Sequence, residues 1–239
     1  MKLNKRIYSK DKDKDKDKDI DLFYSNCYEE LYGTGVIGKL IQRIHSQLDK
    51  PFQGLNALTL IEVGSGNSQH FMQTSLGIKR YLEIDIREKN SKNISFLLMQ
   101  KNGWEFLIDN ANYLKKISEN SFDGLIATCL LAHLENIEIA LENWKRVVRP
   151  GGIISIYVPH EPGILLRFAR KFSTRKKILA QGYDYDYVHW KEHRNHYPAM
   201  RTFVYQVFIN DEIKKKSFPL NFLPWDLNLY SIFYIKKGL

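Results

Sequence analysis

The segment over residues 58–68, LTLIEVGSGNS, constrains the fold more than any other part of the chain. A run of apolar, partly β-branched residues leads to Glu62, and a turn containing Gly64 and Gly66 follows at once. Glycine lets the backbone approach a ligand closely and adopt φ values that a Cβ atom would forbid. A strand, a tight turn and a helix start in this order are how α/β proteins build a nucleotide-shaped pocket. The sequence therefore predicts an α/β sheet whose first strand ends at a ligand site.

Further strand candidates follow at the spacing of strand–helix–strand units. The second covers residues 80–86 and places Asp85 at its tip, where a carboxylate can accept both hydrogen bonds of a ribose diol. The remaining candidates cover residues 104–108, 122–131 and 153–158, and a helix is predicted over 137–148. Because the carboxyl ends of parallel strands share one edge of a sheet, we expect the polar residues after these strands to lie together.

Five motifs stand in order along this stretch: EVGSGN, LEID, DNA, SFDGLIAT and WKRVVRPGGIISI. Over roughly residues 58–160 they resemble the ordered motifs of class I S-adenosylmethionine-dependent methyltransferases of the type 11 kind. The resemblance implies a Rossmann-like sheet of seven strands with helices on both faces, an antiparallel last strand and a lid insertion after strand 5. It also implies S-adenosylmethionine as the cofactor and methyl transfer as the reaction.

The same resemblance implies which residues contact the cofactor. The glycine turn would border the methionine moiety, and the carboxylate after the second strand would bind the ribose. The Asp-Asn pair after the third strand would meet the adenine amino group, and the residues after the fourth would lie beneath the sulfonium. One departure is that Ser68 stands near the position where the family often has a third glycine. The implied residues are Tyr32, Thr34, Glu62, Gly64, Ser65, Gly66, Asp85, Ile86, Asp109, Asn110, Thr128 and Cys129.

Length and composition favour one domain in a reducing compartment. The chain has 239 residues, of which 44% are hydrophobic, and this suffices for a packed core. There is no apolar run of about 18 residues that would span a membrane, and the first residues lack the apolar centre of a signal peptide. The two cysteines indicate neither a disulfide framework nor a metal site. We therefore expect a cytoplasmic protein.

The N-terminal region divides into two parts. Residues 10–19 are strict Lys-Asp repeats without an apolar residue, so residues 1–19 are predicted to be a disordered tail. Residues 20–239 are then a single methyltransferase domain. Its first segment, 20–57, has apolar and aromatic residues at helical spacings, interrupted at 33–35. In the family that the motifs resemble, helices here close over the cofactor, so this segment is predicted to form lid helices.

Residues 163–180 predict a basic amphipathic helix at the start of a substrate-recognition insertion over 160–197. Ile164, Phe168 and Phe172 share one face, whereas the other face is rich in Lys and Arg without an acidic residue. Three interpretations remain open: a solvated face of a lid helix, a site for an anionic or lipid-linked acceptor, or peripheral contact with an anionic membrane surface. Despite a pI near 9.3, no RNA-binding module is added, so no nucleic-acid partner is expected.

The segment 183–200 carries most of the remaining chemistry. A histidine with a near-neutral pKa can take the proton of a sugar or phenol hydroxyl during methyl transfer. A metal site at His189, His193 and His196 has suitable spacing, but no cysteine or carboxylate set completes it, so no metal is predicted. For each histidine, a purely structural hydrogen bond is the alternative. The catalytic candidates are His160, His193 and His196, and the substrate candidates are Glu161, Arg167, Tyr183, His189 and Glu192.

The C-terminal pattern HEPG, a basic helix, EHRNHY and FLPWDLNLYSIFYI resembles methyltransferases of bacterial surface-polysaccharide biosynthesis. This resemblance implies O-methylation of a sugar, glycan or sugar-phosphate intermediate. A second hypothesis is methylation of a lipid or quinone-like small molecule at the membrane face. A third is a non-catalytic, cofactor-binding regulatory subunit. The glycine turn and Asp85 argue against the third, because both are expected to serve a bound cofactor.

Overall fold

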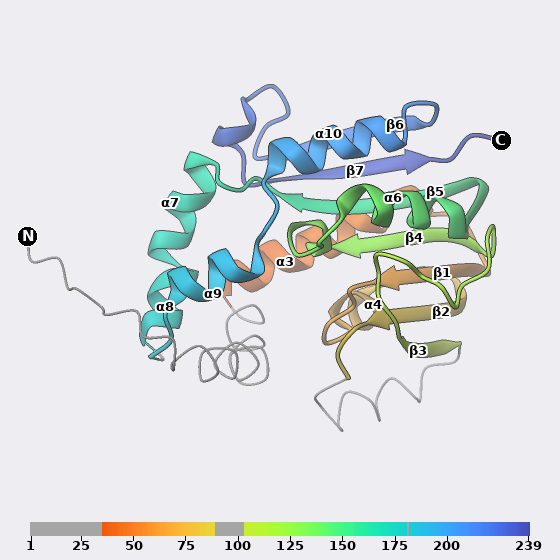
Figure 1. The fold of residues 1–239 in the computed structure, drawn as a ribbon, viewed down its shortest axis with the longest axis horizontal. Coiled ribbons are helices and arrows are strands. Elements are labelled where there is room, and N and C mark those ends of the chain that lie inside the picture. Colours follow the sequence, from red (N-terminus) through yellow and green to blue (C-terminus); the bar gives the residue numbers. More distant parts are fainter. Residues whose placement is uncertain (1–34, 89–102, 181) are drawn as a thin grey trace, which may run out of the picture.

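The computed structural model describes residues 35–88, 103–180 and 182–239. Its centre is a seven-stranded sheet in the order β3-β2-β1-β4-β5-β7-β6 (Figure 1). Strands β1 to β5 pair in parallel, whereas β7 runs antiparallel to both of its neighbours, β5 and β6. The prediction of seven strands with an antiparallel last strand is therefore confirmed. The strands are β1 Leu58–Val63, β2 Ile78–Asp85, β3 Trp104–Ile108, β4 Phe122–Thr128, β5 Val148–Pro159, β6 Glu212–Phe218 and β7 Tyr230–Lys236.

Helices cover both faces of the sheet, as predicted. One face is covered by α6 and α10, and the other by α3 and α4 (Figure 1). The helices are α3 Gly35–Leu48, α4 Gln69–Gln73, α6 Ile137–Val147, α7 Ile164–Phe172, α8 Thr174–Ala180, α9 Tyr185–Glu192 and α10 Tyr197–Val207. Short 3-10 helices lie at η2 Lys50–Phe52, η3 Leu130–Ala132 and η4 Trp225–Leu227.

The two hydrophobic cores follow from the alternation of side chains along the central strands. On β4, Leu125 belongs to the core under α6 and α10, whereas the next residue, Ile126, belongs to the core under α3. A strand that is buried on both faces needs an almost continuous apolar run, which is what FDGLIAT supplies. Trp144 of α6 fills the first core, and its indole nitrogen donates to the carbonyl of Ala111 at 2.9 Å. The central strands are therefore held rigidly below the edge where a ligand would bind.

The described part of the predicted lid segment is a core helix. Ile44 and Leu48 of α3 are buried against β-strand residues such as Ile232. The predicted closure over the cofactor depends on residues 20–34, and the predicted tail on residues 1–19. Both segments lie outside the described residues.

The insertion after β5 differs in detail from its prediction. The single basic helix expected over 163–180 is divided into α7 and α8, which meet at Ser173. With α9, these helices gather beyond the carboxyl ends of β4 and β5 (Figure 1). Over the described part of the chain, no helix reaches the length and apolar character needed to cross a bilayer.

Candidate active site

The glycine turn after β1 has the backbone that its sequence predicted. Gly64 and Gly66 have φ values of 69° and 50°, in the left-handed region that disfavours a side chain. A Cβ atom on Gly64 would lie 2.7 Å from Cδ1 of Leu130, which follows β4. The amide of Gly64 donates to the carbonyl of Ile84 at 2.8 Å. The turn is therefore fixed against both neighbouring strand ends, and Gly64 cannot be replaced without moving Leu130.

Ser68 replaces the third glycine while keeping a glycine-like backbone. It caps α4 with a φ of 60°, which is uncommon for a residue with a side chain. Its side chain is fully buried, and its hydroxyl donates to Glu83 Oε2 at 2.6 Å. This buried hydrogen bond stabilises the strained cap. The departure from the family pattern thus leaves the path of the turn intact.

Asp85 lies at the tip of β2, facing the glycine turn. Its Oδ2 accepts from the amide of Gly66 at 2.9 Å, and its Oδ1 accepts from the amide of Arg87 at 3.0 Å. A carboxylate has about four lone-pair sites, so both oxygens can accept a further hydrogen bond from a ribose diol. Ile86 is 66% exposed directly beside it, which leaves an apolar surface for a base to cover.

Asp109 stands next to Asp85 at the same edge. Asp85 pairs with Ile108 of β3, the residue before Asp109, and the Asp109 amide donates to the Asp85 carbonyl at 3.2 Å. Asp109 Oδ1 accepts from the amide of Asn110 at 2.8 Å. Its Oδ2 is buried and has no hydrogen-bond partner among the described residues. A buried carboxylate oxygen of this kind requires a donor, and the adenine amino group of S-adenosylmethionine is a suitable one.

The residues at the end of β4 are the ones predicted to lie beneath the sulfonium. Thr128 Oγ1 is also buried without a hydrogen-bond partner within the described residues. Cys129 follows with a φ of 60°, and burial raises the pKa of its thiol to about 12. The thiol is therefore neutral at physiological pH. These residues fit a site for S-adenosylmethionine, with an uncharged floor below a cationic sulfonium.

Glu62 and Ser65 connect the glycine turn after β1 to β2 through hydrogen bonds. Glu62 is 2% exposed, and its Oε2 accepts from the hydroxyl of Tyr81 at 3.0 Å. Ser65 is buried, and its amide donates to the carbonyl of Ile84 at 3.2 Å. Contact of either residue with the methionine moiety stays a prediction. The other two predicted cofactor residues, Tyr32 and Thr34, lie outside the described residues.

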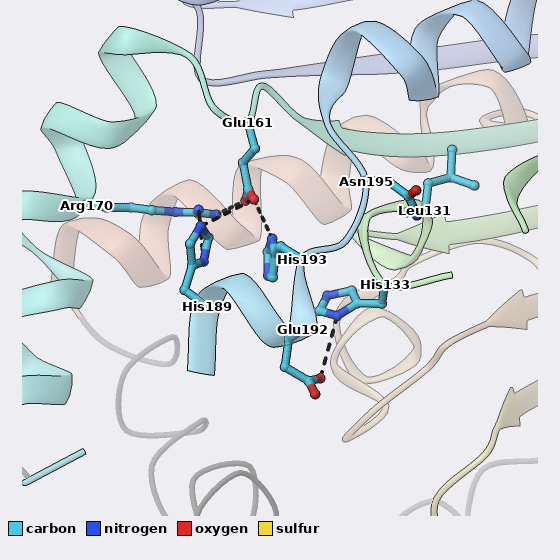
Figure 2. Close-up of polar contacts among 8 residues, drawn as sticks. All are labelled: Leu131, His133, Glu161, Arg170, His189, Glu192, His193 and Asn195. Atoms are coloured by element: carbon cyan, nitrogen blue, oxygen red, sulfur yellow. Dashed lines mark hydrogen bonds and ion pairs between the residues drawn. The ribbon is translucent and has the colours of Figure 1, made fainter. Parts of the chain in front are cut away.

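A second group of polar side chains, called the His193 group below, lies where the insertion meets the sheet. It consists of Glu161, Arg170, His189 and His193. Its centre is Glu161, which follows β5 and is 2% exposed. Glu161 Oε2 accepts from His193 Nδ1 at 2.7 Å, and Oε1 accepts from the Arg170 guanidinium (Figure 2). Arg170 also donates to His189 Nε2 at 3.0 Å. Three separate segments, the β5 end, α7 and α9, therefore meet at one buried carboxylate.

The hydrogen bond to Glu161 fixes the tautomer of His193. An ionised carboxylate can only accept, so Nδ1 carries the proton and Nε2 of the neutral ring is left as a base. Burial lowers the pKa of His193 and outweighs the opposite effect of Glu161, so the ring is neutral at pH 7. Burial alone would raise the pKa of Glu161, but the hydrogen bond from His193 and the charge of Arg170 hold it well below its usual range. The pair is a neutral imidazole oriented by a carboxylate.

This group also has the donor atoms of a metal site. Oxygen and nitrogen donors of Glu161, His189 and His193 lie within 4.8 Å of one another. Glu161 thus provides a carboxylate ligand. It takes the place of His196 in the metal set considered from the sequence. However, the Arg170 guanidinium contacts both Glu161 and His189 and supplies the positive charge. Burial and this neighbouring charge lower the pKa of His189 to about 3, so its ring is neutral. Because the Arg170 guanidinium already serves as the cation between Glu161 and His189, we assign no metal here.

Residues from the cofactor edge reach the same group. The rings of His133 and His193 lie 4.5 Å apart, and His133 Nδ1 is 3.8 Å from Glu192 Oε2 (Figure 2). Arg87, two residues after Asp85, is 3.9 Å from the same carboxylate oxygen. The end of β2 and the His193 segment are therefore adjacent. Sequence reasoning did not select His133, Arg87 or Arg170, although the position of His133 after β4 was a usable signal.

Asn195 fixes the His193 segment to the loop after β4. Its side-chain nitrogen donates to the carbonyls of Leu131 and Leu134 at 2.9 and 2.6 Å. Its amide donates to the carbonyl of Ala132 at 3.1 Å. These three bonds hold the segment against the loop after β4, next to the predicted cofactor residues Thr128 and Cys129.

The structure separates the three catalytic candidates. His160 is fully buried, and its ring nitrogens lie 2.6 Å from the Trp225 carbonyl and 2.7 Å from Ser231 Oγ. Because neither nitrogen is available to a substrate, the geometry corrects its predicted catalytic role to a structural one. His196 is exposed and caps α10 outside the group. Only His193 lies at the carboxylate.

The substrate candidates are also divided. His189 and Glu161 lie in the group, and Glu192 lies at its border with the cofactor edge. Arg167 is exposed on α7 and lines a cavity described below. Tyr183 lies in the turn between α8 and α9, where its amide donates to the Ile178 carbonyl at 3.3 Å.

This sheet order, with a glycine turn after β1 and carboxylates after β2 and β3, is the Rossmann-like fold of S-adenosylmethionine-dependent methyltransferases. Residues 61–156 match the family described as Methyltransferase domain. The chain therefore carries a methyltransferase domain, and the cofactor of this class of enzyme is S-adenosylmethionine. No curated protein sequence gives a significant match.

Solved structures share this fold at low sequence identity. Phosphoethanolamine N-methyltransferase 2 from Haemonchus contortus, in complex with S-adenosylmethionine, aligns with a TM-score of 0.60 and 13% identity. The alignment covers 92% of this chain and 57% of that one. The N-methyltransferase NodS from Bradyrhizobium japonicum aligns with a TM-score of 0.58 and 12% identity, over 84% of this chain and 98% of that one. These likenesses support the fold, and the acceptor has to be inferred from the site.

Proposed function

We propose that this protein is an O-methyltransferase that transfers the methyl group of S-adenosylmethionine to a hydroxyl group, with His193 as the general base. The observation that carries the proposal is the 2.7 Å hydrogen bond from His193 Nδ1 to Glu161 Oε2. It leaves Nε2 as the basic nitrogen, and this atom makes no hydrogen bond within the described residues. Its segment is held by Asn195 against the loop that follows β4.

The chain's own residues supply the proton chemistry of this reaction. When bound, S-adenosylmethionine supplies a methyl group whose C–S bond breaks as the C–O bond to the acceptor forms, which leaves a neutral thioether. The acceptor hydroxyl loses its proton to His193 Nε2. Glu161 then stabilises the imidazolium that results. A hydroxyl needs such a base because its proton is not lost at neutral pH, whereas a neutral amine attacks without prior deprotonation.

A sugar, glycan or sugar-phosphate intermediate is the proposed acceptor. The C-terminal resemblance to enzymes of bacterial surface-polysaccharide biosynthesis favours it. The composition of the site supports a sugar acceptor. The hydrogen-bonding groups Glu192 and His133 lie near His193. The aromatic residues Tyr185 and Trp190 lie on α9, the helix that His193 ends. Polar groups flanked by aromatic rings suit a ring that carries several hydroxyls.

Matched acceptors that differ in one atom test this proposal. The purified protein is incubated with methyl-labelled S-adenosylmethionine and pairs of sugars in which one hydroxyl is replaced by an amine. We expect label to enter the hydroxyl member, as an ether that mass spectrometry and NMR locate. Transfer to the amine member alone would contradict O-methylation. Binding of S-adenosylmethionine without transfer to any acceptor would favour the regulatory subunit.

An acceptor at a membrane is a second candidate, because the apolar face of α7 is exposed. Ile164, Phe168 and Phe172 are 54%, 61% and 64% exposed, and the Lys171 ammonium lies 5.8 Å from the centre of the Phe172 ring. An amphipathic helix with aromatic and basic residues is typical of contact with anionic lipid. Such a surface would bring a cytoplasmic enzyme to a lipid or quinone-like acceptor at the inner face of a membrane.

Co-sedimentation with vesicles tests this contact. The wild-type protein is expected to sediment with vesicles of phosphatidylglycerol and phosphatidylcholine, and the variant F168S/F172S is expected to remain in the supernatant. The control is Ile209→Ser, because Ile209 is 76% exposed at the far end of α10. Equal sedimentation of all three proteins, or no sedimentation of the wild type, would reject membrane contact.

A further inference from the structure

A cavity of about 500 Å³ lies between α7, α8 and α9, next to the His193 group. Four of its lining residues are cations, namely Arg167, Arg170, Lys171 and Arg175, and two are carboxylates, Glu161 and Asp186. The cations come from successive turns of α7 and from α8, because residues three or four apart share a helix face. The cavity thus has more positive than negative charge in its lining.

The two carboxylates are each paired with an arginine. Arg175 donates to both oxygens of Asp186, at 2.9 and 2.7 Å. Arg170 pairs with Glu161 as described above. Arg167 and Lys171 have no ion pair within the described residues, and they lie one helical turn apart on α7. Two positive charges in the lining therefore lack a counter-charge from the described part of the chain.

The rest of the lining suits a flat or ring-shaped molecule. The rings of Tyr185 and His189 are stacked, with centroids 5.2 Å apart and an angle of 8° between their planes. Trp190 is 48% exposed at the cavity and presents a large apolar surface. Aromatic rings of this kind pack against apolar ring faces while cations bind the charged part of a ligand.

The cavity borders the group that contains the proposed base. Glu161 and His189 line it and also belong to the His193 group, and Arg170 contacts both of them (Figure 2). A ligand held in the cavity would therefore lie next to the residues that orient His193.

We propose that this cavity binds a phosphate group of the acceptor, with Arg167 and Lys171 as its charge partners and Trp190 against its ring. The acceptor is then a phosphorylated compound that carries a free hydroxyl. This inference rests on the proposed O-methyltransferase activity and narrows its acceptor class. A doubly charged phosphate matches the two cations that no described carboxylate pairs with, and arginine presents a fork of donors that fits phosphate oxygens.

Phosphate binding can be measured without knowing the acceptor. Inorganic phosphate is titrated against the full-length protein and followed by ³¹P NMR line broadening. The variant R167Q/K171Q is expected to lose about ten- to hundredfold in affinity, because two charged contacts are removed. The matched control is K176Q/K177Q, which removes the same charge from exposed residues of α8 outside the cavity lining. Equal affinity loss in both variants, or tighter binding of malonate than of phosphate, would overturn the proposal.

A second measurement separates this inference from the proposed activity. Methyl transfer is compared for phosphorylated and unphosphorylated members of the same sugar, and for vesicles that contain phosphatidylglycerol. We expect transfer to the soluble sugar phosphates, with R167Q/K171Q raising KM for them by a larger factor than for the unphosphorylated sugars. A preference for the unphosphorylated sugars would refute the phosphate site and leave O-methylation standing. Transfer to the lipid alone would identify a lipid headgroup as the source of the phosphate.

Discussion

The variant His193→Ala is expected to lower kcat by about 10²- to 10⁴-fold, because it removes the proposed general base. Binding of S-adenosylmethionine should be unchanged, since His193 is placed on the acceptor side of the cofactor pocket. The measurement is steady-state turnover with a hydroxyl acceptor identified among the matched sugar pairs, together with calorimetric titration of the cofactor. Loss of kcat without loss of cofactor binding would identify a role in the chemical step.

The control for this variant is His196→Ala. His196 lies three residues after His193, is exposed and is outside the His193 group, so its removal should leave turnover unchanged. The variant Glu161→Gln should fall between the two, because a glutamine can still accept from His193 Nδ1 but cannot stabilise the imidazolium. If His193→Ala and His196→Ala retain equal turnover, histidine base catalysis is wrong.

The pH profile gives an independent test of the same base. His193 must be neutral to accept a proton, so kcat/KM falls when pH drops through its pKa. Burial lowers this pKa below the usual 6.5, despite the nearby carboxylate, while His133 and Arg170 act in the same direction as burial. We therefore expect the acidic limb of kcat/KM to be centred below pH 6.5. An acidic limb centred above pH 6.5 would contradict the assignment.

The strands and the glycine turn could be predicted because each is a local pattern. The run before Glu62 is apolar at every buried position of β1, and Gly64 and Gly66 have the positive φ values that glycine permits. Ser68 was identified as a departure from the family, yet its left-handed backbone depends on a hydrogen bond to Glu83 of another strand. Ser68 and Glu83 lie on different segments of the chain, so no local sequence pattern indicates this contact.

For the acceptor side of the site, the sequence predicts which residues are candidates but not which of them lie together. His160, His193 and His196 have similar chemistry in the sequence, and tertiary contacts separate them. His160 turns into the core because Ser231 and the Trp225 carbonyl bind both of its ring nitrogens. Arg170 had been one of many cations on a basic helix, and its pairing with Glu161 depends on how α7 leaves β5. Local patterns fix neither the buried partner nor the direction of such a helix.

The second large effect is expected at the cofactor. Replacing Asp85 by alanine should weaken binding of S-adenosylmethionine by about a hundredfold or more, because two charge-assisted hydrogen bonds to the ribose diol are lost. The variant also removes the acceptor for the amides of Gly66 and Arg87, which shape the pocket on either side. Calorimetric titration of the cofactor measures the change. Asp85→Asn keeps one acceptor oxygen and should show a smaller loss.

Glu88→Ala is the matched control for Asp85→Ala. Glu88 is exposed three residues further along and loses the same charge, so a general electrostatic effect would appear in both variants. A similar thermal unfolding temperature for the two variants would show that the fold survives. Affinity should then fall for Asp85→Ala alone. Equal affinity in the two variants would mean that the ribose is bound elsewhere, and the cofactor assignment at the end of β2 would have to be abandoned together with the placement of His193 beside it.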